Sequence, residues 1–273
     1  MLEHRANEKP PAVLIIGGDG SIGQVLAPKL ADLGYEVILG DKAFADSKPG
    51  KTPAGFATYP LDATSPASLR TFRKSIEKDG IALSHVVNAV GGLCETGLTD
   101  MFKTSAKEIT RTIKLNLLSQ IYPVRYLGRH LMQTPGTNKS FTLVSSINAF
   151  TGYSIPFYSA AKRGLSGFLS PAAMDLGQYG IRINSVVPGS VVTPETLRQP
   201  KNFADRAAAA ALKRLCAPEE VADGIIACIQ LTGMTGREIV IDAGQSVNPA
   251  ESLFDQARRG TVPGLKRQRR PTR

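Results

Sequence analysis

Tyr158 and Lys162 stand four residues apart in the stretch YSAAK, residues 158–162. On a helix this spacing places both side chains on one face as neighbours. A tyrosine with its ordinary pKa of about 10 is a poor proton carrier at neutral pH. A lysine ammonium beside it favours the phenolate, so the pair suggests a general acid/base. A strand-like run ending in VSS, with Ser146 twelve residues before Tyr158, precedes the pair.

A second group of residues, the glycine-rich stretch IIGGDGSIGQ (15–24), favours phosphate binding. Gly17, Gly20 and Gly23 follow an apolar run and precede a helical pattern, at G-x-x-G-x-x-G spacing. Glycines at such a turn let a pyrophosphate approach bare backbone amides at a helix N-terminus. Asp41 follows at the end of the second predicted strand, where a carboxylate can accept hydrogen bonds from an adenosine ribose. The alternative is a tight turn and an acid that merely starts a loop.

These residues require a framework of alternating strands and helices to position them. Several strand-length runs are rich in Val and Ile without alternation, which is typical of strands buried on both faces of a parallel sheet. The expected strands are 12–17, 35–39, 86–90, 141–145, 182–187 and 238–241, with a less regular run at 55–59. The expected helices are 22–33, 66–78, 104–132, 157–179 and 218–231. This order predicts an α/β fold with helices on both faces of the sheet.

The motifs together resemble those of the short-chain dehydrogenase/reductase family over nearly the whole chain. Besides the glycine-rich turn and YSAAK, they are NAVGG (88–92), KLNLLS (114–119), VSS (144–146), GIRINSVVPGSVVTPE (180–195) and TGREIVIDAGQS (235–246). The resemblance implies a Rossmann-type doubly wound parallel sheet of about seven strands. It also implies an NAD(P)-dependent oxidoreductase that interconverts a secondary alcohol and a ketone by hydride transfer.

The resemblance also implies a role for individual residues. Tyr158 is the implied general acid/base, Lys162 binds the nicotinamide ribose and lowers the pKa of Tyr158, and Ser146 holds the substrate oxygen. Asn116 orders a water in the proton relay. The implied cofactor-binding residues are Gly17, Gly20, Ser21, Ile22, Gly23, Asp41, Asp62, Ala63, Asn88, Tyr158, Lys162, Pro188, Gly189, Val191 and Thr193. Each polar residue has a structural alternative: Ser146 as a strand cap, Asn116 on a helix surface, Thr193 at the start of a turn.

Two departures from the family pattern bear on the glycine-rich turn and on the active serine. Ile16 and Ser21 stand where the family has threonine and its middle glycine, and the glycine spacing is that of extended members. We expect a single-domain member with a variant loop, because the closing motif leaves no room for their additional domain. The spacing from Ser146 to Tyr158 is one residue shorter than usual. Ser145 would restore it, but the local sequence SSINA favours Ser146.

The substrate pocket is the least readable part of the site. Loop 147–157 is expected to absorb the missing residue and to shape the pocket. Its expected lining is Leu93, Cys94, Asn148, Tyr153 and residues of a flap at about 190–214. Carbohydrate, steroid, acyl-thioester and natural-product substrates all stay open.

Composition limits the function classes that remain. The 273 residues are 42% hydrophobic and 21% charged, which are globular values, and three cysteines without metal-type spacing argue for a reducing, cytoplasmic setting. No apolar run approaches the length that spans a membrane. The net charge of +10 resides mainly in residues 256–273, since the remaining 26 basic and 23 acidic residues leave +3. Nucleic-acid binding is therefore not expected.

The expected organisation is a flexible N-terminus (1–10), one Rossmann domain (11–250) and a basic, disordered tail (251–273). NAD is expected in preference to NADP because of Asp41, although Lys42 beside it could serve a phosphate. No metal is expected. The expected partners are a small alcohol or ketone and further copies of the chain, as a homotetramer or dimer. The alternative function is a non-catalytic dinucleotide sensor or a polyanion-binding protein on the same fold.

Overall fold

The computed structural model describes residues 10–45, 49–93, 101–151, 156–197 and 200–247. The basic tail (251–273), the predicted flexible segment 1–9, and Cys94 and Tyr153 of the expected pocket lie outside these residues. No helix in the described part of the chain is long and apolar enough to cross a membrane.

A single sheet in the order β3-β4-β2-β1-β5-β6-β7-β8 forms the centre of the domain. Its strands are β1 (Ala12–Ile16), β2 (Glu36–Asp41), β3 (Gly50–Lys51), β4 (Ala57–Pro60), β5 (Leu83–Asn88), β6 (Lys139–Val144), β7 (Ile181–Pro188) and β8 (Glu238–Ile241). All pairings are parallel except that of β3 with β4. The predicted doubly wound fold is thus confirmed, and the expected seven parallel strands are joined by one short antiparallel strand.

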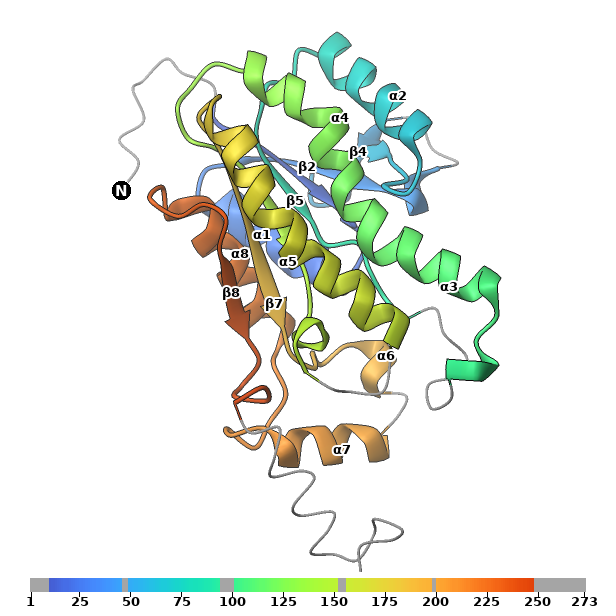
Figure 1. Ribbon diagram of the computed structural model, residues 1–273. Coiled ribbons are helices and arrows are strands. Elements are labelled where there is room, and N and C mark those ends of the chain that lie inside the picture. The colour runs from blue at the N-terminus through green and yellow to red at the C-terminus, as the bar shows by residue number, and fades with distance from the viewer. Residues whose placement is uncertain (1–9, 46–48, 94–100, 152–155, 198–199, 248–273) are drawn as a thin grey trace, which may run out of the picture.

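Helices cover both faces of the sheet (Figure 1). The helices α1 (Ser21–Asp32) and α8 (Pro218–Gln230) pack together on one face, and α2 (Pro66–Lys78), α4 (Ser119–Gln133) and α5 (Pro156–Gly177) lie on the other. The helices α6 (Pro194–Leu197) and α7 (Pro200–Ala209) lie beyond the carboxyl ends of the strands, at the bottom of the view. They form the greater part of the predicted flap.

The core has two halves, one on each side of the sheet, and β1 contributes to both. Val13 and Ile15 pack with α1 and α8, whereas Leu14 and Ile16 pack with α2, α4 and α5. All five residues of β1 are buried. This double burial is the physical reason for the uninterrupted apolar run AVLII, since no residue of the strand faces water.

The predicted helix 104–132 is divided in the structure. The helix α3 (Ala106–Ile113) begins at a capping box of Ser105 and Glu108, and a π-helical turn, η3 (Lys114–Leu118), separates it from α4. The short 3-10 turns are η1 (Lys42–Phe44), η2 (Met101–Lys103) and η4 (Ile147–Ala149). The strand β5 also begins earlier than predicted, at Leu83, because the polar His85 is buried and hydrogen bonds Ser140 on β6.

Arg182 on β7 fastens the carboxyl end of α8 to the sheet. Its guanidinium donates to the carbonyl oxygens of Cys228, Ile229, Leu231 and Met234 at 2.7–3.2 Å, and to the Asn138 side chain at 2.9 Å. The last carbonyls of a helix lack partners within the helix. A single side chain therefore satisfies the end of α8 and fixes that helix relative to β7.

We expect Arg182→Met to lower the free energy of unfolding by about 2–4 kcal/mol, because it leaves several partly buried carbonyls without donors. Urea denaturation followed by circular dichroism measures this change. Arg163→Met, on the exposed side of α5, is the matched control and should change the stability by less than about 0.5 kcal/mol. Equal stabilities of the two variants would contradict the assignment.

Candidate active site

The glycine-rich turn joins β1 to α1 and is folded tightly against the neighbouring strand. The amides of Gly17 and Gly18 both donate to the carbonyl of Gly40, at 2.9 and 3.3 Å. Gly17 has a φ of +84°, which favours glycine. A Cβ on Gly23 would lie 2.5 Å from the Gly17 oxygen, so the first turn of α1 packs against bare backbone.

Gly20 and Ser21, the second of which is a variant position of this turn, begin α1. Gly20 is the N-cap residue of α1, in an extended conformation that any residue adopts, and it provides no side-chain cap. Ser21 is the first residue of the helix, and the first turn holds no acidic residue. An N-terminus in this state presents free N–H groups and a positive dipole end, which suit a phosphate group.

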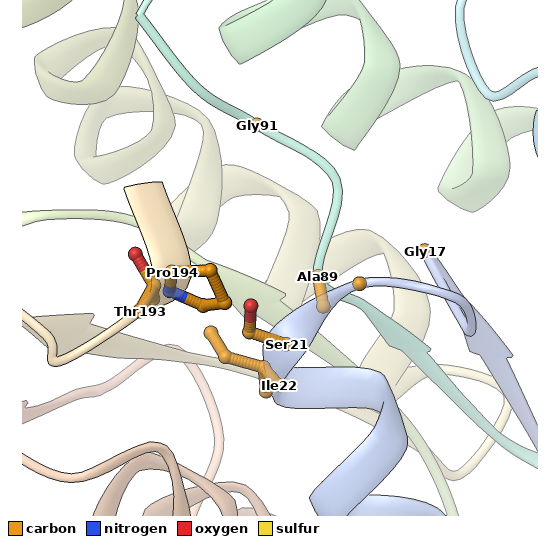
Figure 2. Close-up of a pocket in the computed structure, with 8 residues that line it drawn as sticks. Gly17, Ser21, Ile22, Ala89, Gly91, Thr193 and Pro194 are labelled. Carbon is orange, nitrogen blue, oxygen red and sulfur yellow. The ribbon is translucent and has the colours of Figure 1, made fainter. Parts of the chain in front are cut away.

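A cleft with a volume of about 400 Å³ opens above this helix end. Figure 2 shows Ser21 and Ile22 on one side and Thr193 and Pro194 opposite them. Other lining residues are Gly17, Gly20, Ala89 and Gly91. The uncapped helix end and the glycine-lined cleft fit the pyrophosphate of a dinucleotide.

Asp41 ends β2 and Asp62 lies two residues beyond the end of β4, and both carboxylates accept hydrogen bonds from backbone amides. Asp41 accepts from Asp19 N (3.1 Å) and Ala43 N (3.0 Å). Asp62 accepts from the amide and hydroxyl of Thr64, at 2.8 and 2.7 Å. Ala63, next to Asp62, is buried. Asp41 thus spans from the end of β2 to the glycine-rich turn, which fixes its carboxylate near the predicted ribose position.

Asn88 ends β5 in a buried amide network. Its side chain donates to Ser119 O at 2.7 Å and accepts from Val90 N at 3.1 Å. Gln120 on α4 donates to the carbonyls of Asn88 and Val90 at 3.3 and 2.6 Å, and it accepts from Val144 N at 3.4 Å. The sequence prediction missed Gln120. Its signal is a polar residue on the apolar side of a predicted helix.

Asn116 lies within the π-helical turn and is fully buried. Its side chain makes two hydrogen bonds with the backbone of Gly92, both 2.9 Å long, and donates to Thr112 O at 3.1 Å. A Cβ on Gly91 would lie 3.2 Å from Asn116 Oδ1 and 3.1 Å from Lys162 Nζ. The structure therefore brings Asn116 and Lys162 to the same glycine, which lines the cleft.

Ser146, Tyr158 and Lys162 come together from β6 and α5. Lys162 is buried, donates to Val144 O at 2.8 Å, and has its Nζ 5.7 Å from the centroid of the Tyr158 ring. The Ser146 hydroxyl is hydrogen bonded with Tyr158 and contacts Asn148 Oδ1 at 3.3 Å. The neighbouring Ser145 faces away, toward the backbone carbonyl of Lys162. This geometry agrees with the choice of Ser146 over Ser145.

Burial dominates the acid–base properties of this group. It raises the pKa of Tyr158, and the hydrogen bond with Ser146 acts in the opposite direction. It lowers the pKa of Lys162 to about 7. The sequence led us to expect that Lys162 lowers the pKa of Tyr158. In this structure burial has the larger effect, so the pKa of Tyr158 is raised instead.

The segment that follows β7 forms the opposite wall of the cleft. Pro188 is the last residue of the strand, and Val191 pairs with Cys216 in an isolated bridge. A Cβ on Gly189 would lie 2.8 Å from both Asp242 Cβ and Gln245 Oε1. Thr193 lines the cleft, but its hydroxyl also accepts from Thr196 N at the start of α6. Thr193 therefore lines the cleft and also forms the turn at the start of α6, which was its structural alternative.

No group of three or more His, Cys, Asp or Glu side chains in the described ranges is placed to hold a metal ion. The titratable and hydroxyl groups that the structure brings together beside the cleft are Tyr158, Lys162 and Ser146.

Comparisons with known proteins agree on the kind of protein. A family model described as enoyl-(acyl carrier protein) reductase matches residues 17–246. L-rhamnose 1-dehydrogenase (NADP(+)) of Thermoplasma acidophilum is 27% identical over 249 residues, covering 86% of this chain and 96% of that protein. (3R)-3-hydroxyacyl-CoA dehydrogenase of Mus musculus is 24% identical over 250 residues, covering 85% and 94%.

A solved structure shares the fold. Ligand-free aldohexose dehydrogenase of Thermoplasma acidophilum superimposes with a TM-score of 0.76 at 21% identity, covering 88% of this chain and 95% of that one. Because the family match extends from the glycine-rich turn to the closing strand, this chain belongs to the short-chain dehydrogenase/reductase family.

Proposed function

We propose that Tyr158 is the general acid/base of this enzyme, with Ser146 and Lys162 as its partners. The chain is an NAD(P)-dependent oxidoreductase that acts on CH–OH groups and interconverts alcohols and ketones. The observation that supports these roles is the hydroxyl pair of Ser146 and Tyr158, placed beside the buried ammonium of Lys162. Two hydroxyl groups and one cation can polarise a carbonyl oxygen and deliver a proton to it.

The protein residues then have the following roles in the reaction. A bound nicotinamide supplies or accepts the hydride. Ser146 donates a hydrogen bond to the substrate oxygen, and Tyr158 gives that oxygen a proton during reduction or takes one during oxidation. The raised pKa of Tyr158 keeps its proton available until the site is loaded. Lys162 binds the nicotinamide ribose, and Asn116 orders a water near Lys162.

The remaining proposed cofactor-binding residues lie at or near the carboxyl ends of the strands. We propose that the α1 N-terminus, through Gly17, Gly20, Ser21, Ile22 and Gly23, holds the pyrophosphate. Asp62 and Ala63 face the adenine, and Asn88 supports the central strands beside the cofactor. The segment Pro188–Thr193, with Gly189 and Val191, holds the carboxamide.

For the adenosine ribose we propose NAD over NADP. The relative from Thermoplasma acidophilum is named as an NADP(+) enzyme, so the relatives do not support this preference. The argument rests on Asp41, whose carboxylate two backbone amides fix in place. A 2′-phosphate would bring negative charge against it, whereas Lys42 is exposed and free to turn toward water.

Assembly and location follow the family resemblance. We propose a homotetramer or dimer in the cytoplasm. The polyanion-binding alternative depends on the basic tail, which lies outside the described residues, so no observed contact favours it.

Removal of the phenolic hydroxyl tests the proposed mechanism. Tyr158→Phe keeps the ring and should still bind cofactor, but kcat should fall by at least about 10²-fold because the proton donor is lost. The assay uses the best substrate from a panel of secondary alcohols and ketones, with NAD and NADP. Turnover within a few-fold of wild type would exclude Tyr158 as the acid/base.

The buried lysine predicts how stability depends on pH. The pKa of Lys162 is about 7 in the folded protein, compared with 10.5 for an unperturbed lysine. Between these values the unfolded chain binds more protons, so stability rises with pH in this window. The unfolding free energy of wild type minus that of Lys162→Met should therefore rise with pH, by at most about 1.4 kcal/mol per pH unit.

Urea denaturation of the cofactor-free proteins at several values between pH 7 and 10 measures this difference. Contributions from other titrating groups cancel between the two proteins. A difference that stays constant over this range would show that Lys162 is not buried as the structure describes.

The cofactor preference is tested by steady-state kinetics with both cofactors. Wild type should show a kcat/KM at least about tenfold higher with NAD, equivalent to about 1.4 kcal/mol. Asp41→Asn removes the charge and keeps an oxygen for one of the two backbone amides, which bond different carboxylate oxygens, so it should narrow the difference in kcat/KM between NAD and NADP. An equal or higher kcat/KM with NADP in the wild-type enzyme would refute the assignment of Asp41.

A further inference from the structure

Ser190 lies in the segment that leads from β7 to the cleft, and the structure restrains it through its carbonyl, its amide and its hydroxyl. Its carbonyl accepts from Cys216 N at 3.1 Å. Its amide and its hydroxyl both bond the side chain of Gln245, 55 residues further along the chain. Three residues beyond Ser190, Thr193 lines the cleft.

Gln245 reaches Ser190 from the loop that follows β8. Its Oε1 accepts from Ser190 N at 2.8 Å, and its Nε2 is 3.2 Å from Ser190 Oγ. The side chain is 3% exposed, so water does not replace these contacts. An amide offers an acceptor and a donor side by side, which is the combination that an N–H group and a neighbouring hydroxyl require.

The loop that carries Gln245 is itself fixed. The buried Asp242 carboxylate accepts from Gly244 N (2.8 Å) and Ser246 N (2.7 Å), and Gln245 N donates to Asp242 O at 2.9 Å. Ala243 and Gly244 both have a positive φ, of 52° and 77°. The loop is therefore a compact turn whose side chain at Gln245 has a defined direction.

The segment that follows β7 and this turn are in direct contact. Gly189 leaves no space for a Cβ because Asp242 and Gln245 lie 2.8 Å from where it would be. Leu212 N and Ala211 N, at the base of the flap, donate to the carbonyls of Ala243 and Gly244 at 3.0 and 3.3 Å. A single turn thus supports both the segment after β7 and the end of the flap.

We propose that Gln245 is a positioning residue for the cofactor, which it serves by fixing the backbone of Ser190 and thereby the segment that ends at Thr193 in the cleft. This inference rests on the proposed cofactor site. Gln245 does not line the cleft, so it acts through Ser190. Loss of its acceptor leaves a partly buried N–H without a partner, and the wall moves to find one.

Replacement by a residue of similar size tests this role. Gln245→Met fills the same space without an acceptor, and the dissociation constant for NADH should rise about tenfold, within the range expected when a buried donor loses its partner. The KM for NADH should rise in parallel, whereas kcat and the KM for the ketone should stay within about twofold. Gln245→Glu keeps an oxygen toward Ser190 N and should lose less affinity than Gln245→Met.

The matched control is a buried polar side chain at the amino end of β6, at the other end of the strands from the cleft. Lys139 is 7% exposed and donates to Thr134 O at 2.9 Å, so Lys139→Met also removes a buried hydrogen bond. It should lower the thermal midpoint of unfolding without changing the dissociation constant for NADH. NADH is titrated by its own fluorescence, at temperatures where all variants are folded by circular dichroism.

Two results would overturn the inference. An unchanged dissociation constant in Gln245→Met is one, and an equal rise in Gln245→Met and Lys139→Met is the other, because it would reflect general destabilisation. If wild type bound neither NADH nor NADPH, the proposed function would fall together with this inference. That outcome is distinct from the first two, in which wild type binds normally.

Discussion

The burial of the Lys162 ammonium is the constraint on which the site depends. A cation removed from water is costly unless nearby groups compensate it. Within the described chain it has the carbonyl of Val144 and the ring of Tyr158. The pKa of about 7 expresses the remaining cost.

The parallel sheet explains why residues so distant in sequence meet around the cleft. Val144 ends β6, Asn88 ends β5, and the glycine-rich turn follows β1. All three strands run in the same direction, so their carboxyl ends meet at one edge, where the order of strands reverses between β1 and β5. The helices add Tyr158, Asn116 and Gln120 from one face only. The cleft therefore lies at the carboxyl ends of the strands, where strand ends, loops and helix α5 all contribute to the site.

Sequence reasoning predicted the fold because burial leaves a direct pattern. The run AVLII is apolar throughout since both faces of β1 are covered. It predicted Tyr158 and Lys162 because four residues on a helix make neighbours. It did not predict the early start of β5, since His85 becomes a core residue only through Ser140 on another strand. Gln245 and Ser190 are a similar case, as their pairing is created by the sheet and leaves no local signal. The lowered pKa of Lys162 likewise depends on enclosure by several segments.

The π-helical turn at Lys114–Leu118 fixes the length of the chain in this region more strictly than its composition. A π turn holds one residue more than an α-helix would use, and each residue of an α-helix turns the chain by about 100°. Deletion of one residue in the turn would restore a regular α-helix, and the side chains of the turn itself would change direction while the flanking helices kept theirs. Asn116 would then leave Gly92, whereas Gln120 on α4 would keep its contacts with Val90 and Val144. Substitutions are thus easier to accommodate here than insertions or deletions, and the count of residues between Thr112 and Gln120 is itself a structural requirement.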